Sequence, residues 1–260
     1  MSAFDVLPFP TERQLVVDAG YLASRRHIFY GLAEVDVTRA RGALRARPAA
    51  DGHRQSFTGY IVASLARAVE AHREVQAYRD WRGRLVLFHD VDVVTMVEPE
   101  PGAVAIPHII RGANRKTFSE ISEEIRSIQR RPERGVPQPG IGRLAPRVPR
   151  WVRLLFFWTV KKSPHWFRRL EGTVVVTSVG MFARGGLWGI GFLPTHTMGL
   201  TVGGISQKPG VHEGAISIRD YLNLTLAFDH DVVDGAPAAR FGRTLVDLIE
   251  SAAVLEGEIH

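Results

Sequence analysis

Two kinds of hydrophobic periodicity alternate along the chain and predict strands interleaved with helices. Apolar and polar positions alternate in RHIFYGLAEVDVT (26–38), which predicts a strand. Apolar residues recur at helical spacing in SFTGYIVASLARAVEAHREV (56–75), which predicts a long amphipathic helix packed on a sheet. The same patterns predict further strands at 84–98, 103–110, 172–180, 195–205 and 214–231, and further helices at 38–47, 117–131 and 236–255. The series predicts a mixed α/β fold, with helices on a large sheet and antiparallel hairpins near its end.

Composition narrows the class of protein without naming it. The chain has 260 residues, of which 45% are hydrophobic and 23% are charged, and this is ordinary for a globular domain. We expect one domain over 25–260, preceded by a lead-in of little periodicity over 1–24. The absence of cysteine excludes disulfides, thiolate nucleophiles and cysteine-ligated zinc, and it fits a cytoplasmic location. We identify no signal peptide and no run of about 18 apolar residues that could span a membrane.

Positive charge is concentrated in one segment. Residues 130–170 carry eleven Lys/Arg and a single acid, so this stretch has a net charge of +10 in a chain whose total is +6. Because the rest of the chain is then slightly acidic, we expect no nucleic-acid partner. We treat 131–170 as a basic, aromatic insert: its first half reads as a Pro/Gly-rich loop, and RWVRLLFFWTVKK predicts a short helix.

The insert leaves three interpretations open. Its helix packs on the protein itself or on another copy, forms a lid over an acyl or acceptor pocket, or contacts a membrane through 150–169. Membrane contact is the least favoured of the three, since LLFFWTV contains only seven uncharged residues.

Candidate chemistry gathers in LAFDHDVVDGAPAARF, near the end of the chain. A predicted strand delivers His230 at its end, Gly235 is expected to permit a turn, and a helix then begins. A neutral imidazole at such a junction can act as a general base, and Asp234 could pair with a distant arginine to pin the loop. The alternative is a buried histidine that satisfies backbone groups while the aspartates cap the helix.

The full string resembles the His-x-x-x-Asp-Gly active-site motif of the chloramphenicol acetyltransferase-like superfamily. More closely, DHDVVDGAPAARF resembles the catalytic domain of the dihydrolipoamide acyltransferase subunits of 2-oxoacid dehydrogenase complexes. Three further stretches, EVDVT, PHIIRGANRKTFSEISEEI and GTVVVTSVGMF, resemble that family in the same order, so the likeness covers about residues 25–250 apart from the insert. It implies a chloramphenicol acetyltransferase-like mixed sheet covered by helices, in a single domain.

The resemblance also implies a reaction, which is acyl transfer between coenzyme A (CoA) and a thiol such as dihydrolipoamide. His230 would be the general base, Asp234 would hold the histidine loop, and Thr177 would donate to the oxyanion, with Ser178 as a weaker substitute. Ser178 and Gly235 are the candidates for contact with CoA. Family members are trimers with the site at the subunit interface, so His230 and Thr177 are expected to come from different copies of a homotrimer.

Several features depart from the family pattern. Asp231 stands where the family has arginine, and two carboxylates flanking His230 would favour the imidazolium if they lie close. We expect a stand-alone core without a lipoyl group, acting on a lipoyl-bearing protein or a small acceptor, and a trimer that builds no larger cage. No histidine spacing indicates a metal site. The competing hypothesis is a non-catalytic trimeric scaffold or partner subunit of a dehydrogenase or acyltransferase assembly.

Overall fold

The centre of the structure is a six-stranded mixed sheet. The computed structural model describes residues 3–11, 13–47, 55–97, 106–130, 147–180 and 185–256. The strand order is β1-β8-β7-β6-β4-β5, with β6 parallel to both of its neighbours and the other pairs antiparallel. The strands are β1 (Ile28–Asp36), β4 (Val93–Val97), β5 (Ile106–Ile110), β6 (Val174–Ser178), β7 (Met198–His212) and β8 (Ala215–Asp229).

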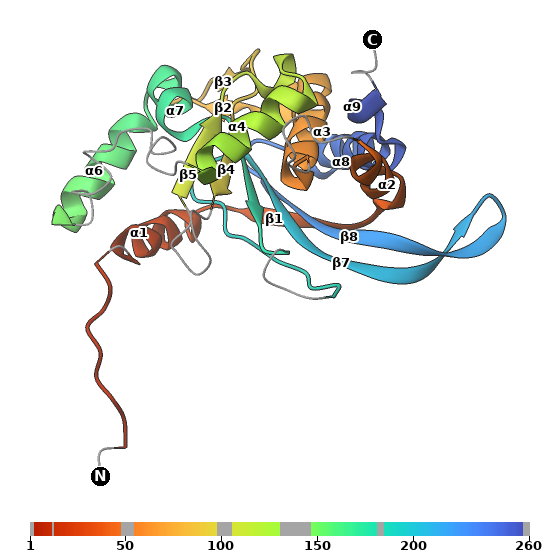
Figure 1. Cartoon of the computed structure of the whole chain (residues 1–260). Coiled ribbons are helices and arrows are strands. Elements are labelled where there is room, and N and C mark those ends of the chain that lie inside the picture. Colours follow the sequence, from red (N-terminus) through yellow and green to blue (C-terminus); the bar gives the residue numbers. More distant parts are fainter. Residues whose placement is uncertain are drawn as a thin grey trace.

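Helices gather over one face of this sheet (Figure 1). The central one, α3, contacts both α4 and α8, and most of its residues are buried. It is therefore enclosed on more sides than the predicted amphipathic helix would be. Ser56 caps its first turn by accepting a hydrogen bond from the Gly59 amide. The helices of this layer are α2 (Thr38–Ala46), α3 (Phe57–Ala71), α4 (Phe118–Arg130), α8 (Gly235–Ser251) and α9 (Ala253–Glu256).

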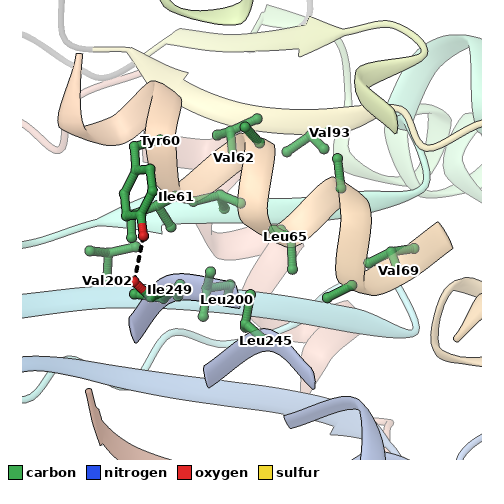
Figure 2. Packing of buried hydrophobic residues seen from close by; sticks show 14 of the residues in the cluster. Tyr60, Ile61, Val62, Leu65, Val69, Val93, Leu200, Val202, Leu245 and Ile249 are labelled. Atoms are coloured by element: carbon green, nitrogen blue, oxygen red, sulfur yellow. Dashed lines mark hydrogen bonds between the residues drawn. The ribbon is translucent and has the colours of Figure 1, made fainter. Parts of the chain in front are cut away.

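The main core lies between α3, α8 and the sheet. Leu65 and Val69 of α3 pack with Leu200 of β7 and Leu245 of α8 (Figure 2). The buried Tyr60 hydroxyl donates to the Ile249 carbonyl at 2.5 Å, which satisfies the one polar atom of that ring. This packing fixes α8 against the sheet, and α8 begins just after the candidate histidine.

Strands β7 and β8 form a long hairpin that extends past the helices (Figure 1). Its two-residue turn is Glu213–Gly214, with φ of 50° and 79°, as a type I′ turn requires. Near the tip, Val211, Ile216 and Ile218 are exposed. Exposed apolar side chains that gather in this way are typical of surfaces that contact other proteins or membranes.

The predicted strand over 84–98 is interrupted. Its start pairs as β3 (Leu85–Val86) with β2 (Tyr78–Arg79), in a separate two-stranded sheet, and the main sheet is joined only at β4. The break covers 87–92 and ends at Asp92, whose buried carboxylate accepts from the Gly112 amide and from Arg168 Nε, each at 2.8 Å. A side chain that takes backbone donors in this way competes with a continuous strand. Two 3-10 turns, η1 (Arg73–Gln76) and η2 (Ala113–Arg115), complete the connections.

The lead-in and the insert meet each other in the fold. The expected lead-in contains a helix that the sequence pattern did not predict, α1 (Arg13–Ala23). The insert supplies the expected helix as α6 (Arg150–Val160) and adds α7 (Pro164–Glu171), whereas its loop over 131–146 lies outside the described residues. Asp18 of α1 is fully buried, and its carboxylate accepts from Arg153 Nε at 2.6 Å. Within the described ranges, no helix is long and apolar enough to cross a membrane.

Candidate active site

His230 stands directly after the last residue of β8, as predicted. Its amide donates to the His27 carbonyl at 2.8 Å, and its ring lies 4.9 Å from the ring of Phe29. The side chain is 54% exposed, so it is not the buried structural histidine of the alternative interpretation. No group in the described part of the chain hydrogen-bonds to either ring nitrogen. The imidazole therefore stays accessible to a ligand.

Asp229 fixes the loop that carries His230. Its carbonyl accepts from the amides of Val232 and Val233, both at 3.0 Å, and its carboxylate pairs with Arg26. Arg26 also donates to the carbonyls of Thr195 and His196, each at 2.8 Å. Burial lowers the pKa of Arg26, and the neighbouring Asp229 carboxylate opposes that effect. Through its two terminal nitrogens, the largely buried Arg26 guanidinium thus ties the end of β8 to the segment just before β7.

We expect Arg26→Met to destabilise the fold by about 3 kcal/mol, because it leaves the Asp229 carboxylate buried without its cation. Urea unfolding measures the change. The double variant Arg26→Met/Asp229→Leu is the control, and we expect it to recover part of the lost stability since no unpaired charge remains. A single variant within about 0.5 kcal/mol of the wild type would contradict this account of the loop.

The carboxylate of Asp231 turns away from His230. Its Oδ1 lies 2.9 Å from His27 Nδ1. This hydrogen bond and the charge of Asp231 raise the pKa of His27, and the same contact lowers the pKa of Asp231. Since Asp229 is paired with Arg26, neither flanking carboxylate bonds to His230. The unusual Asp231 is therefore paired with His27, the residue directly before the neighbouring strand β1.

The His27–Asp231 contact predicts a shifted titration. We expect the NMR titration midpoint of His27 to lie above its ordinary 6.5, and to return close to 6.5 in Asp231→Asn. The contact stabilises the fold while His27 is charged, so its contribution is complete below pH 6.5 and is lost as the pH rises through the raised pKa. On the acid side it is lost as the pH falls through the lowered pKa of Asp231, below 3.8. An unchanged His27 midpoint in Asp231→Asn would show that the two side chains do not meet in solution.

Asp234 differs from its expected role within the chain. It is the N-cap residue of α8, but its side chain makes no capping hydrogen bond and is 83% exposed. Its Oδ1 lies 3.7 Å from His230 Nδ1, the distance of an ion pair when the imidazole is protonated. The aspartate that pairs with a distant arginine is Asp229, not Asp234. Asp234 is instead the carboxylate nearest to the charge that His230 would acquire as a base.

Gly235 does not have the predicted backbone role. It is absent from the glycines of positive φ, and a Cβ at this position would contact no other atom of the described chain. The turn therefore does not require glycine. What the missing side chain leaves is open space beside the first turn of α8.

Thr177 and Ser178 lie at the end of β6 and point to opposite faces of the sheet. Val176 is buried on the helix side, so Thr177 points to the other face, where it stands opposite Thr201 of β7. Thr201 in turn pairs with Thr225 of β8, five residues before His230. At about 3.3 Å per residue and about 4.8 Å between strands, Thr177 and His230 are some 16 Å apart along the strands and roughly 10 Å across them. One chain does not bring the two residues together.

A buried polar layer joins the insert to this loop, and sequence reasoning missed it. His196 Nε2 donates to the Glu171 carbonyl at 2.6 Å, and Thr195 Oγ1 donates to the Glu171 carboxylate at 3.2 Å. Burial lowers the pKa of His196 to about 4, so the ring is neutral near pH 7, and burial raises the pKa of Glu171. Because Arg26 holds the carbonyls of Thr195 and His196, the end of α7 is linked to the histidine loop. In the part of the chain that the structure describes, no three His, Asp or Glu side chains group as a metal site.

Comparison of the chain with models of protein families identifies the family to which it belongs. The model of the family described as 2-oxoacid dehydrogenases acyltransferase (catalytic domain) matches residues 23–139 and 169–256. The chain therefore belongs to this family. The unmatched stretch lies within the basic insert, and the expected family resemblance is confirmed.

Curated relatives are longer than this chain. The acetyltransferase component of the pyruvate dehydrogenase complex of Rickettsia felis is 24% identical over 78% of the chain and 42% of its own length. The corresponding protein of Bacillus subtilis is 25% identical over 79% of the chain and 40% of its own length. The chain thus spans about two fifths of the length of these relatives.

Solved structures share the fold. The cubic core of a pyruvate dehydrogenase multienzyme complex superimposes with a TM-score of 0.73 at 18% identity, covering 97% of this chain and 93% of the other. A probable dihydrolipoamide acetyltransferase from Listeria monocytogenes gives 0.72 at 18% identity, covering 96% and 95%. A chloramphenicol acetyltransferase gives 0.56 at 16% identity, covering 95% and 99%. The expected mixed sheet covered by helices is confirmed.

Proposed function

We propose that this chain transfers acyl groups between CoA and a thiol, with His230 as the general base. The observation that carries the proposal is the accessible imidazole of His230. The loop that holds it is fixed by the ion pair between Arg26 and Asp229. Such a base takes the proton of the attacking thiol, and the thiolate adds to the thioester carbonyl carbon. The tetrahedral intermediate then expels the second thiolate, which receives the same proton back from His230. Asp234, 3.7 Å away, offsets the transient positive charge of the imidazolium.

The oxyanion of that intermediate needs a donor, which we assign to the Thr177 hydroxyl of a second copy. The separation of Thr177 and His230 along the strands of one chain supports this assignment. The exposed apolar side chains on the hairpin tip give a neighbouring copy a surface to cover. We therefore propose a homotrimer with each site at a subunit interface. Ser178 points to the helix side of β6 and is proposed only as a contact for CoA.

A relative offers a parallel for these roles. In the dihydrolipoamide acetyltransferase of Azotobacter vinelandii, a serine, a histidine and an asparagine four residues after that histidine have been investigated for their role in catalysis. His230 and Asp234 have the same spacing, and Thr177 offers a hydroxyl as serine does. The open space beside Gly235 gives CoA room next to the first turn of α8.

Acceptor-dependent turnover is the decisive test. Release of the CoA thiol is measured from a panel of acyl-CoAs of increasing chain length, with and without dihydrolipoamide, and CoA binding is measured separately by calorimetry. His230→Ala is compared with the wild type in the same assay. Turnover that requires dihydrolipoamide supports the proposal, and turnover with a different nucleophile keeps the base but changes the acceptor class. A protein that neither turns over nor binds CoA would instead be the non-catalytic scaffold.

A further inference from the structure

The outward face of α6 is apolar. Trp151, Leu155 and Trp158 follow one another at intervals of four and three residues, so they form a single row along the helix. Their exposed fractions are 70%, 50% and 55%. Lys162 continues the row one turn further, and its ammonium lies 3.4 Å above the centre of the Trp158 ring. Figure 1 shows α6 projecting from the body of the protein beside α1.

Contacts on the inward face of α6 hold the helix so that its aromatic row points outward. Arg153 lies on the opposite side of the helix from the aromatic row and forms a buried ion pair with Asp18 of α1. Val160, on the same inner side, is buried in a small cluster with Tyr78 and Phe167. The helix therefore has its charged anchor inside and its tryptophans outside, which reverses the usual pattern of a surface helix. A helix held in this way presents its apolar row as part of the folded structure.

The segment that carries the row is basic. Residues 147–170 contain seven Lys/Arg and no Asp or Glu. Arg150, Arg153 and Arg168 pair with aspartates, whereas Lys162 and Arg169 are exposed. Trp166 of α7 adds another half-exposed tryptophan, and Arg169, three residues further along α7, is exposed. Tryptophan favours the boundary between lipid and water, and Lys/Arg at that boundary are attracted to anionic headgroups. With eleven residues, α6 has a length that fits a helix lying on a bilayer, not one crossing it.

We propose that α6 and the start of α7 form a docking surface for an anionic lipid bilayer. Trp151, Leu155 and Trp158 enter the headgroup region, while Lys162 and Arg169 contact the headgroups. The charge pattern favours lipid over a pairing of two α6 helices across a two-fold axis, because such a contact would bring each cationic rim against its own counterpart. The exposure of the row favours membrane contact over burial on the same chain and over a cover for His230, since neither leaves the tryptophans in water. Packing of α6 on another copy would instead appear as a lower oligomer mass in Trp151→Glu/Trp158→Glu.

Vesicle binding by the full chain tests the proposal. The probes are vesicles of phosphatidylcholine alone and of phosphatidylcholine mixed with phosphatidylglycerol, and binding is measured by sedimentation. We expect binding only to the mixed vesicles, with at least about a tenfold loss of affinity in Trp151→Glu/Trp158→Glu. Lys162→Gln/Arg169→Gln is expected to lose about tenfold while keeping the aromatic row intact. Brominated lipids are expected to quench tryptophan fluorescence of the unaltered protein, which requires no variant to fold.

The control introduces the same charge elsewhere. Ser251→Glu/Ala253→Glu changes two exposed residues at the end of α8 and the start of α9, on the side of the molecule away from α6 (Figure 1), and is expected to bind vesicles like the wild type. The proposal is overturned if the wild type ignores anionic vesicles, or if the control loses as much affinity as the α6 variant. It is also overturned if Trp151→Glu/Trp158→Glu lowers the oligomer mass in light scattering, because α6 then packs between copies. None of these measurements uses acyl transfer, so they test the membrane-docking proposal independently of the proposed reaction.

Discussion

Replacing His230 with alanine is expected to lower the rate of acyl transfer by about 10²–10⁴-fold, the usual contribution of a positioned general base. The proton of the attacking thiol then has no acceptor at the site, so only the small fraction of thiol already ionised reacts. Because the imidazole is half-exposed and no hydrogen bond within the described chain depends on it, the unfolding free energy should change by no more than about 0.5 kcal/mol. Steady-state thiol release and urea unfolding measure the two quantities.

The matched control for this variant is His27→Ala. His27 is a neighbouring exposed histidine whose carbonyl binds the His230 amide, and its side chain contacts Asp231 instead of the site. We expect this control to keep most of the activity. Added imidazole should restore part of the rate to His230→Ala, since it replaces the missing base. Equal activity in the wild type and His230→Ala would remove His230 from the mechanism and leave the scaffold hypothesis.

Local pattern predicted most of the sheet and its helices, because each of those elements carries its own periodicity. The long helix over 56–75 is an example: its apolar spacing reflects the core that it enters, and the structure places α3 there. The break at Asp92 escaped prediction, because the cause is a buried carboxylate whose donors lie far along the chain, at Gly112 and Arg168. Helix α1 was missed for the same reason, since it is anchored by Arg153 of α6.

In the candidate site, too, local features were predicted and contacts between distant parts of the chain were missed. The spacing of His230 and Asp234 is local, so the sequence motif was sufficient to select both residues. Arg26 was missed because its partner Asp229 lies 203 residues further along the chain. One available signal was the flanking Asp229 itself, since a carboxylate at the buried end of a strand requires a cation. The adjacent Arg25 and Arg26, just before the strand that pairs with β8, offered candidates for it.

Mixed trimers built from two inactive variants are expected to regain about a third of the wild-type activity. The variants are His230→Ala and Thr177→Val, the second of which keeps the side-chain shape but removes the hydroxyl. Loss of one oxyanion donor alone costs about 10²–10³-fold, so both parent proteins are nearly silent. Co-expression with two different tags and purification on both yields only trimers that contain each variant.

The expected fraction follows from the cyclic arrangement. Suppose that each site combines His230 of one copy with Thr177 of the next copy around the ring. In every mixed trimer, a chain with intact His230 then precedes a chain with intact Thr177 at one interface, so about one site in three is complete. If each chain supplies both groups to its own site, no mixed trimer has a complete site and activity stays at the background of the parents. Doubly tagged trimers made only of His230→Ala give that background directly. Because Thr177 and His230 lie at different levels of the sheet within one chain, we expect the first result. A silent mixture would overturn the assignment of the two groups to different copies, whereas an active Thr177→Val parent would move the oxyanion donor to another residue.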